Sequence, residues 1–600
     1  MKKTIFILTA LLFAGITTTA QEYIIVDGPY SGDGESMYFI PLSEIDSLTY
    51  EEHTTKSRIF LSDILAEDEN ISIYAEALQA TGLDDSLHAH LDYNYHVDYN
   101  LTRWTSNIMI TPVTTDYDNV AYPNTRMIKF TAFVVQDKIL KEKYGIENLK
   151  GLRQLAATIY DEMYPEDAQY YDDMTDRRNS LNRFMAYHIL NRYGSYYTLT
   201  AVDEPDSELA AKWNRNVWDI ADWYETMMPH SLMKFSFPKG ENEGLYINRR
   251  GVQSGADERG VFIQGSRVCP QEEMTVRNEA INGIYHYIDD IVHYGRETQE
   301  VVLDERMRID ATTLSPDFMT SRARGHYSRF GKYAYGDSKS DITNRRTCIG
   351  FMPRFVENFY FAWQMHVRPR TLNFWNYQGD EVVIKGSEDI KFKLPSLPAG
   401  TYELRIGTQV GWPSGVYQFL IDGVVMRDNV DFSIPGTNPS IGWLSDQATN
   451  NVDSQIADAA YFITDESKEI YNTESGLKDL EDITGVPIAV WEYIYDLPED
   501  NRYDYLASYM TSYIGHNDAF MRNKGWMKGP ASYYTPNSFR DLANILRCII
   551  GTFTTDGKTD HYLTIKTLDH VRGRDYFLLD YIELCPSSVY DNASVPEDKW

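Results

Sequence analysis

Hydrophobic residues in the first half of the chain alternate between helical and extended spacing. The helical segments repeat an apolar residue every three or four positions, whereas the extended segment is a run of β-branched and aromatic residues. The pattern predicts helices at 59–65, 73–78, 136–163 and 180–192 and a strand at 127–135. Gly82 and Ser180 stand where a C-terminal and an N-terminal helix cap are expected. We therefore expect a mixed domain over residues 57–294, after a leader at 21–56.

The second half of the chain has the pattern of an all-β domain. Short runs of strand length alternate with turns rich in Gly, Pro and Asp. Strands are predicted at 381–385, 390–394, 402–408, 417–421, 546–555, 562–567 and 576–584. Residues 455–515 interrupt this pattern with helix-like sequence rich in Tyr, Asp and Glu. We expect an α+β protein whose second half, 300–600, is a jelly-roll-like β-sandwich with a helical insertion.

The first twenty residues have the features of a Sec signal peptide. Lys2 and Lys3 precede an apolar run at 5–13, and small residues at 18–20 form a cleavage site before Gln21. No Cys lies near this site, so a bacterial lipid anchor is not expected. No later run reaches 18 apolar residues, so no transmembrane segment is predicted. The segment predicts an extracytoplasmic protein.

The charge balance restricts the partners. The chain has 56 basic and 88 acidic residues, a formal net charge of −32. Such a surface repels phosphate backbones and anionic headgroups, so nucleic acid is not an expected partner. Neutral or cationic ligands remain.

Cysteines are too few to form a disulfide framework. The four are Cys269, Cys348, Cys548 and Cys585. Cys548 and Cys585 lie in predicted strands, and two alternatives stay open for them, a disulfide or two buried thiols.

Three segments of the first half resemble, in order, the signatures of fasciclin-like domains. They are residues 130–137 with Phe130, Thr131 and Phe133; residues 181–190 with Tyr187 and His188; and residues 282–292 with Asn282, Gly283, His286, Ile288 and Asp289. The chain departs from the family at Val135-Gln136, where Pro-Thr is usual. The resemblance implies a fasciclin-like fold for 57–294. It also implies a link to adhesion, because the Tyr–His segment has that role in animal members.

The second half resembles the β-sandwich modules that follow fasciclin-like domains in secreted proteins of Bacteroidetes glycan-uptake loci. The resemblance rests on residues 379–381, 397–405, 519–530 and 580–584. The last of these is similar to the closing strand of galactose-binding-like sandwiches. The resemblance implies a role beside a carbohydrate-uptake system.

Physical chemistry assigns most of the motif residues to the architecture. Asn282-Gly283 is expected to supply a positive φ for a tight turn. Alternation then places His286 among the apolar residues of a strand, which predicts a core histidine. Tyr187 and His188 project about 100° apart on a helix, so we expect them to differ in burial, with a structural role for the pair.

The sequence does not match the common enzyme motifs. The chain has no H-E-x-x-H sequence, and its G-x-x-S-G segments do not match the nucleophile elbow. The best metal candidate is His88-x-His90-x-Asp92 with His96, for which an exposed polar cluster is the alternative. We therefore predict no catalytic residues, no metal and no cofactor.

Sugar binding requires aromatic faces and a few polar groups, and three tryptophans suit this role. Trp412, Trp443 and Trp526 each follow a Gly, where the chain turns and a ring can stand out from the surface. Arg405 and Asp422 are the polar candidates for the same site. The alternative is that these rings cap the sandwich core.

Three functions are compatible with these patterns. The first is a non-catalytic adhesion or glycan-binding protein beside a carbohydrate-uptake system. The second is a secreted carbohydrate-active hydrolase, since 88 carboxylates are present. The third is a protein-binding scaffold at the cell surface. The expected partner is a glycan or a cell-surface protein.

Overall fold

The fold is available as a computed structural model, which describes most of the chain after residue 58. The described residues are 23–27, 37–41, 59–98, 117–123, 125–200, 221–238, 243–251, 259–320, 345–362, 364–369, 377, 380–385, 389–411, 414–530, 539–569 and 576–591. Residues 1–58 and 59–600 form two separate units. In the first unit, β1 (Tyr23–Asp27) pairs antiparallel with β2 (Met37–Pro41). The proposed signal peptide and Trp412 lie outside the described residues.

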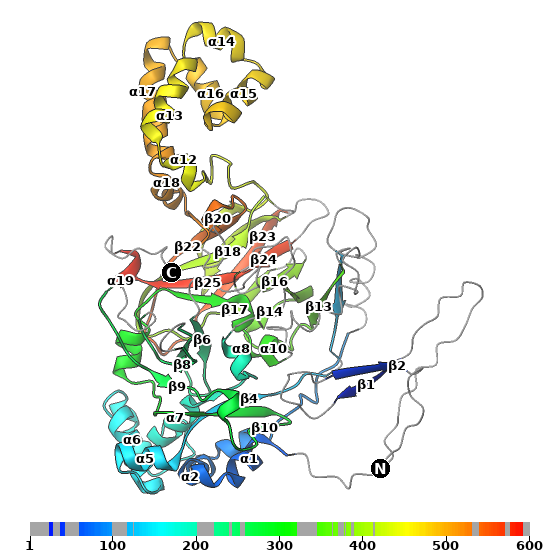
Figure 1. The fold of residues 1–600 in the computed structure, drawn as a ribbon, viewed down its shortest axis with the longest axis vertical. Helices are drawn as coiled ribbons and strands as arrows, with labels where there is room; N and C mark the ends of the chain where they lie inside the picture. The colour runs from blue at the N-terminus through cyan, green and yellow to red at the C-terminus, as the bar shows by residue number, and fades with distance from the viewer. Residues whose placement is uncertain are drawn as a thin grey trace, which may run out of the picture. The chain divides into compact units, whose positions relative to one another are not determined.

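The second unit begins with helices packed beside a small sheet (Figure 1). The helices are α1 (Leu61–Glu67), α2 (Ser72–Ala80), α3 (Leu83–Ser86), α5 (Asp137–Tyr144), α6 (Leu149–Tyr160), α7 (Ser180–Tyr187) and α8 (Tyr196–Thr200). The sheet has the order β10 (Glu279–Ala280), β11 (Gly283–Ile288), β4 (Phe130–Val135) and β5 (Ile189–Leu190). Strand β4 runs parallel to β11, so two of the motif segments lie side by side.

An antiparallel sheet follows in the chain. Its order is β6 (Asp222–Glu225), β7 (Leu232–Ser236), β8 (Tyr246–Ile247) and β9 (Ser266–Arg267). Two short elements, β12 (Met307–Asp310) and α10 (Pro316–Thr320), lead from it toward the second half.

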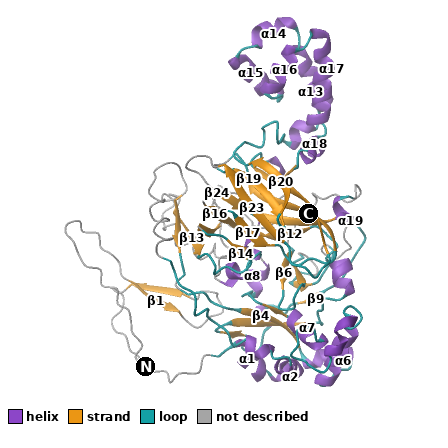
Figure 2. Ribbon diagram, turned by 180° about the vertical axis from the view of Figure 1, so that it is seen from behind, coloured by secondary structure: helices purple, strands orange, loops and turns teal. Residues whose placement is uncertain are grey.

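Three five-stranded sheets account for most of the second half (Figure 2). The first is β12, β25 (Tyr581–Pro586), β18 (Gly400–Gln409), β22 (Ile545–Thr555) and β21 (Trp526–Lys528). The second is β24 (Tyr576–Leu579), β16 (Asp380–Lys385), β15 (Gln364–Pro369), β13 (Arg345–Phe351) and β3 (Tyr117–Ala121). The third is β14 (Phe359–Tyr360), β17 (Ile390–Lys393), β23 (Tyr562–Asp569), β19 (Val416–Ile421) and β20 (Val424–Asp431). The short helix α19 (Ser587–Tyr590) follows β25. The α+β class predicted from the sequence is confirmed.

A helical insertion separates β20 from β21. Its α-helices are α12 (Asp446–Thr449), α13 (Val452–Ala459), α14 (Asp465–Tyr471), α15 (Glu474–Thr484), α16 (Ile488–Asp496), α17 (Glu499–Tyr509) and α18 (Asn517–Asn523). These helices enclose a hydrophobic cluster of their own around Trp491 and Leu480. The helices predicted for 455–515 are present, and the helical region is longer at both ends.

The two halves of the second unit share one core and one sheet. A continuous buried hydrophobic cluster runs from Leu61 to Leu584. Strand β3, from the predicted first domain, pairs in parallel with β13 of the second half. A boundary near residue 295 therefore does not separate two cores, and the autonomy of each half stays a prediction.

Local details depart from the sequence prediction where a single residue stops an element. The helix expected over 136–163 is divided at Gly145, which has φ +68. The N-cap of α7 is Asn179, whose side chain accepts hydrogen bonds from two backbone amides, and Ser180 is the first helical residue. The strand expected over 576–584 is interrupted at Asp580, whose carboxylate accepts a hydrogen bond from the backbone of Tyr377.

Within the described part of the chain, no helix combines the length and the apolar composition that crossing a bilayer requires.

Candidate functional site

The motif strands β4 and β11 place most of their motif residues in the core. Phe133 lies opposite His286 in the parallel register, and their rings stack with centroids 5.8 Å apart. His286 is fully buried, and its Nε2 donates to the carbonyl oxygen of Gly194 at 3.0 Å. Thr131 is also buried, and its hydroxyl donates to the carbonyl of Arg192. The core position predicted for His286 is confirmed.

The remaining residues of these strands are structural as well. Phe130 and Ile288 are buried. Asp289 follows β11 and accepts a hydrogen bond from the backbone amide of Arg267 at 2.7 Å. Both signatures therefore hold the sheet together.

The expectation that Tyr187 and His188 differ in burial is wrong. Both side chains are fully buried. Tyr187 donates to the carbonyl of Leu232 at 3.1 Å, and His188 Nδ1 donates to the carbonyl of Phe184 at 2.8 Å. Helix α7 is enclosed on nearly all sides and ends at Tyr187, so the residue after it also points into protein.

The positive φ expected at Asn282-Gly283 is absent. Neither residue has φ > 0; Ile281 and Asn282 form the two-residue connection between β10 and β11, and Gly283 is the first residue of β11. Gly283 is needed for a close approach instead, since a Cβ there would lie 2.6 Å from the carbonyl oxygen of Phe130. The Asn282 side chain accepts from the backbone of Leu61 and donates to that of Ala89, which joins the turn to the N-terminal helices.

The buried histidines predict a pH dependence of stability. Burial lowers the pKa of His188 and of His286, each to about 4. A histidine in the unfolded chain has a pKa of about 6.5, so between pH 4 and pH 6.5 the unfolded chain binds more protons than the folded protein. The contribution of each buried histidine to the free energy of unfolding is therefore fully present above about pH 6.5. It is lost as the pH falls toward 4, by up to about 1.4 kcal/mol per pH unit for each histidine. Urea unfolding of the protein between about pH 7 and 4.5 measures this slope.

A variant assigns the slope. His286→Gln keeps a hydrogen-bond donor but removes the titratable ring, so it should reduce the slope by one histidine's share. An unchanged slope in this variant would show that His286 does not contribute.

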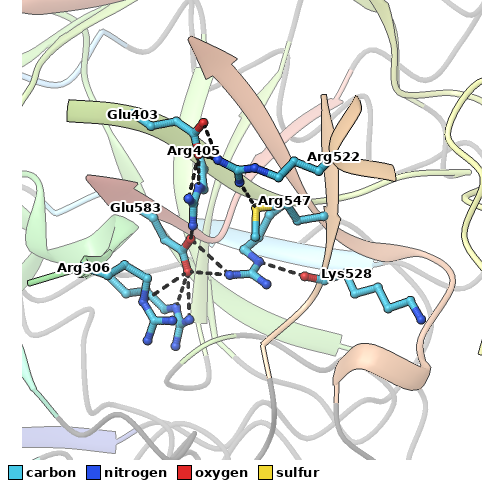
Figure 3. Close-up of polar contacts among 9 residues, drawn as sticks. Arg306, Glu403, Arg405, Arg522, Lys528, Arg547 and Glu583 are labelled. Carbon is cyan, nitrogen blue, oxygen red and sulfur yellow. Dashed lines mark hydrogen bonds and ion pairs between the residues drawn. The ribbon is translucent and has the colours of Figure 1, made fainter. Parts of the chain in front are cut away.

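Arg405 lies in a buried cluster of charged side chains centred on Glu583 (Figure 3). Arg308 Nε donates to Glu583 Oε1 at 2.8 Å, and Arg405 Nη1 donates to Oε2 at 3.2 Å. Arg547 Nη1 lies 3.3 Å from Oε2, and Arg306 Nε lies 3.9 Å from Oε1. The pairing register places Arg308, Glu583 and Arg405 in one row across β12, β25 and β18. We call these five residues the Glu583 cluster.

Glu403 extends the cluster along β18. Its carboxylate accepts from Arg405 Nε at 2.6 Å and from Arg522 at 2.9 Å. Burial alone would raise the pKa of Glu583, but the surrounding guanidinium groups, first those of Arg547 and Arg308, hold it well below its usual range. Glu583 is therefore ionised, and the cluster ties four strands together by charge. Arg405 is fully buried, so its predicted place at a surface sugar site is wrong.

Removing the central carboxylate should be strongly destabilising. Glu583→Gln leaves buried guanidinium groups without their shared counter-charge, which costs about 3–5 kcal/mol for a broken buried ion pair. Urea unfolding at neutral pH tests this. Glu147→Gln is the matched control, because the Lys141–Glu147 pair lies in solvent, and it should leave the unfolding free energy unchanged. Equal midpoints for the two variants would contradict a structural role for the cluster.

Trp443 and Trp526 are buried, so the prediction that their rings stand out is wrong. Trp526 is 3% exposed, and its ring packs edge-on against Phe432 with ring centroids 5.6 Å apart. Trp443 is 9% exposed, and its indole nitrogen donates to the carbonyl of Arg540 at 2.9 Å. The preceding glycines do turn the chain with positive φ, but the rings turn inward. The alternative, that these tryptophans cap the core, is confirmed for both.

Trp526→Ala should therefore destabilise the fold. Truncating a buried tryptophan costs about 3–5 kcal/mol through lost burial and a residual cavity. Thermal or urea unfolding measures this loss. Tyr461→Ala is the control, since Tyr461 is 77% exposed and should leave stability nearly unchanged. A Trp526 variant as stable as the control would contradict the buried position.

Asp422 belongs to a different, exposed site. It occupies the two-residue turn between β19 and β20 with Gly423, and both residues have positive φ, as an Asp-Gly hairpin requires. Its Oδ2 lies 2.7 Å from His561 Nδ1, and its Oδ1 accepts from the backbone amide of Tyr562 at 2.9 Å. The turn is thereby fixed against the start of β23.

Tyr562 also belongs to a group of three neighbouring side chains. Tyr360 and Tyr562 approach each other with ring centroids 6.2 Å apart. Lys391 Nζ lies 4.3 Å from the Tyr562 ring centroid and 5.8 Å from that of Tyr360. Tyr360 is 56% exposed, and Lys391 is exposed. We call Tyr360, Lys391 and Tyr562 the tyrosine patch.

Strand alternation explains why the tyrosine patch faces water. Ile390, Phe392 and Leu563 point into the core, so Lys391 and Tyr562 point to the other face. The sequence prediction found β17 and β23 but not the short strand β14, and it did not select Tyr360, Lys391 or Tyr562. The alternating pattern of residues 390–394 indicates that Lys391 faces solvent. The pairing of β14, β17 and β23, which are distant in the chain, cannot be predicted from local sequence.

The structure separates the metal candidates. His88 contacts the hydroxyl of Ser62 at 3.1 Å, and Asp92 forms an ion pair with Arg126 at 3.0 Å. Within the described ranges, no group of three His, Cys, Asp or Glu side chains is placed to hold a metal ion.

The two strand cysteines do not lie opposite each other. Cys548 on β22 pairs with Ile406, and Cys585 on β25 pairs with Glu403. Because β18 runs between β22 and β25, their Cα atoms are about 10 Å apart or more, beyond the reach of a disulfide. Cys548 is a buried thiol whose pKa burial raises to about 11.

Comparison with known proteins adds no assignment. The chain matches no protein-family model, and no curated protein is significantly similar to it.

Proposed function

We propose that this protein is a non-catalytic, extracytoplasmic adhesion protein that binds a neutral glycan at the tyrosine patch. The observation that carries the proposal is the pair of tyrosine rings beside Lys391 on the solvent face of the third five-stranded sheet. Aromatic faces stack on the C–H surfaces of sugars without needing an opposite charge, which suits a chain of net charge −32.

The polar member of the patch is a hydrogen-bond donor. Lys391 is exposed and holds its ammonium group beside both rings. The carboxylate of Asp422, in its Asp-Gly turn, accepts from the backbone amide of Tyr562 and so fixes the start of the strand that carries this ring before any ligand arrives. A rigid site loses little conformational entropy on binding, which favours recognition by a few contacts.

Two further features support the broader proposal. The parallel pairing of β4 with β11 joins the two strand segments that resemble fasciclin-like domains, and an adhesion role accompanies that resemblance. The basic and apolar start of the chain, with its small-residue cleavage site, supports export from the cytoplasm.

Binding to a panel of soluble polysaccharides tests the function. The mature chain should bind at least one neutral glycan, and Tyr360→Ala should weaken that binding about three- to tenfold, the value of one aromatic contact. The variant should keep the melting temperature of the parent, because the ring is mostly exposed.

Tyr93→Ala is the matched control. Tyr93 is 80% exposed and lies near the N-terminal helices, so its loss should leave glycan binding unchanged. Equal weakening by both variants would contradict the assignment to the patch. Release of new reducing ends from any polysaccharide in the panel would contradict the non-catalytic function and support the hydrolase alternative.

A further inference from the structure

The helical insertion has features of an independent small domain. Its hydrophobic cluster, which includes Leu480, Trp491, Ile494 and Leu506, is distinct from the main core. Its base is fixed by Asp446, which binds Lys528 at 2.7 Å and Arg540 at 2.8 Å. The insertion therefore has a packed core of its own, and part of its surface stays exposed to solvent.

Part of that surface is a row of tyrosines. The Tyr493 and Tyr505 rings lie 4.7 Å apart across α16 and α17. Tyr509 follows Tyr505 by four residues on α17, so the two share a face of the helix. We call Tyr493, Tyr505 and Tyr509 the tyrosine ridge. Tyr493 is 50% exposed, and the other two are half-buried.

The ridge lies in strongly acidic surroundings. Residues 446–523 contain sixteen Asp and Glu against four Lys and Arg, a formal net charge of −12. Asp496 follows Tyr493 by three residues and is exposed on the same face of α16. Asp504 is exposed beside Tyr505.

The four cations of the insertion already have partners. Lys478 binds Glu481 and Asp482, and Arg502 binds Asp465. Arg522 binds Glu403, and Lys468 donates to the carbonyl of Tyr495. Three of the four are therefore paired with carboxylates, and the insertion as a whole keeps its negative net charge.

We propose that the tyrosine ridge docks an arginine- or lysine-rich segment of a partner protein. A guanidinium group stacks on a tyrosine face while its edge donates to a carboxylate, and Tyr493 with Asp496 presents both groups on one helix face. The chain uses the same stacking elsewhere, since Arg153 lies 4.3 Å from the Tyr171 ring and Arg178 lies 3.7 Å from the Tyr170 ring. A second copy of this chain does not fit the ridge, because two surfaces of like charge repel.

The test uses the mature chain and a fluorescein-labelled peptide of alternating arginine and glycine, at about 0.15 M salt to screen long-range attraction. The double variant Tyr493→Leu/Tyr505→Leu keeps apolar volume and helix propensity but removes the ring faces, and should weaken binding about tenfold. Tyr493→Phe/Tyr505→Phe keeps the rings and should retain most of the affinity. Asp496→Asn should also weaken binding.

Tyr461→Leu is the matched control within the insertion. Tyr461 is 77% exposed and its ring contacts only Phe462 among the described aromatic contacts, so the variant should bind the peptide like the parent. A peptide of alternating glutamine and glycine should not bind. Leucine variants that bind as tightly as the parent would overturn the proposal, as would self-association that disappears in those variants.

The peptide-binding test of the tyrosine ridge does not depend on the glycan site. The leucine variants should bind polysaccharide like the parent, since the tyrosine patch lies on other strands. Ridge-dependent peptide binding by a chain that binds no glycan would reject the proposed function alone.

Discussion

The carboxylate of Glu583 is the charge on which the central sheet depends. Guanidinium groups from β12, β18 and β22 converge on it, and Glu583 itself lies near the end of the chain. Its neighbours Ile582 and Leu584 are buried on the opposite side of β25. The sheet is therefore covered on both faces, one packed by hydrophobic side chains and the other held by ion pairs. The free-energy cost of desolvating so many charges is offset only when all partners are in place. The cluster therefore favours a single strand register.

This cluster also shows what hydrophobic patterning cannot predict. In the run Tyr402–Ile406, apolar and polar residues alternate, as in a strand with one face in water. The pattern locates the strand correctly and assigns Arg405 to the wrong environment, because a buried ionic face and a solvated face have the same sequence. Partners 178 residues apart decide between them.

In other parts of the fold as well, some features follow from the local sequence and others follow from contacts between distant segments. The strands and most helices follow from local periodicity, and the helical insertion is evident from a change of composition. The burial of His188 follows from the enclosure of α7, and the inward rings of Trp443 and Trp526 follow from packing that the preceding glycine does not determine. The tyrosine patch combines Tyr360, Lys391 and Tyr562 from three strands that are far apart in sequence. Of the three, only Lys391 had a local signal, the alternation of residues 390–394.

The attachment of the helical insertion has a consequence for how such proteins vary. The chain leaves one five-stranded sheet after β20 and enters another at β21, and the carboxylate of Asp446 binds both Lys528 and Arg540 where the insertion begins. These cations lower the pKa of Asp446 to about 2 against the effect of its burial, so these ion pairs persist across ordinary pH. The insertion has its own core and contributes no strand to either sheet, so sequence changes in that core do not alter any strand pairing. Evolution can therefore replace the helices at this position while the sheets on either side stay the same.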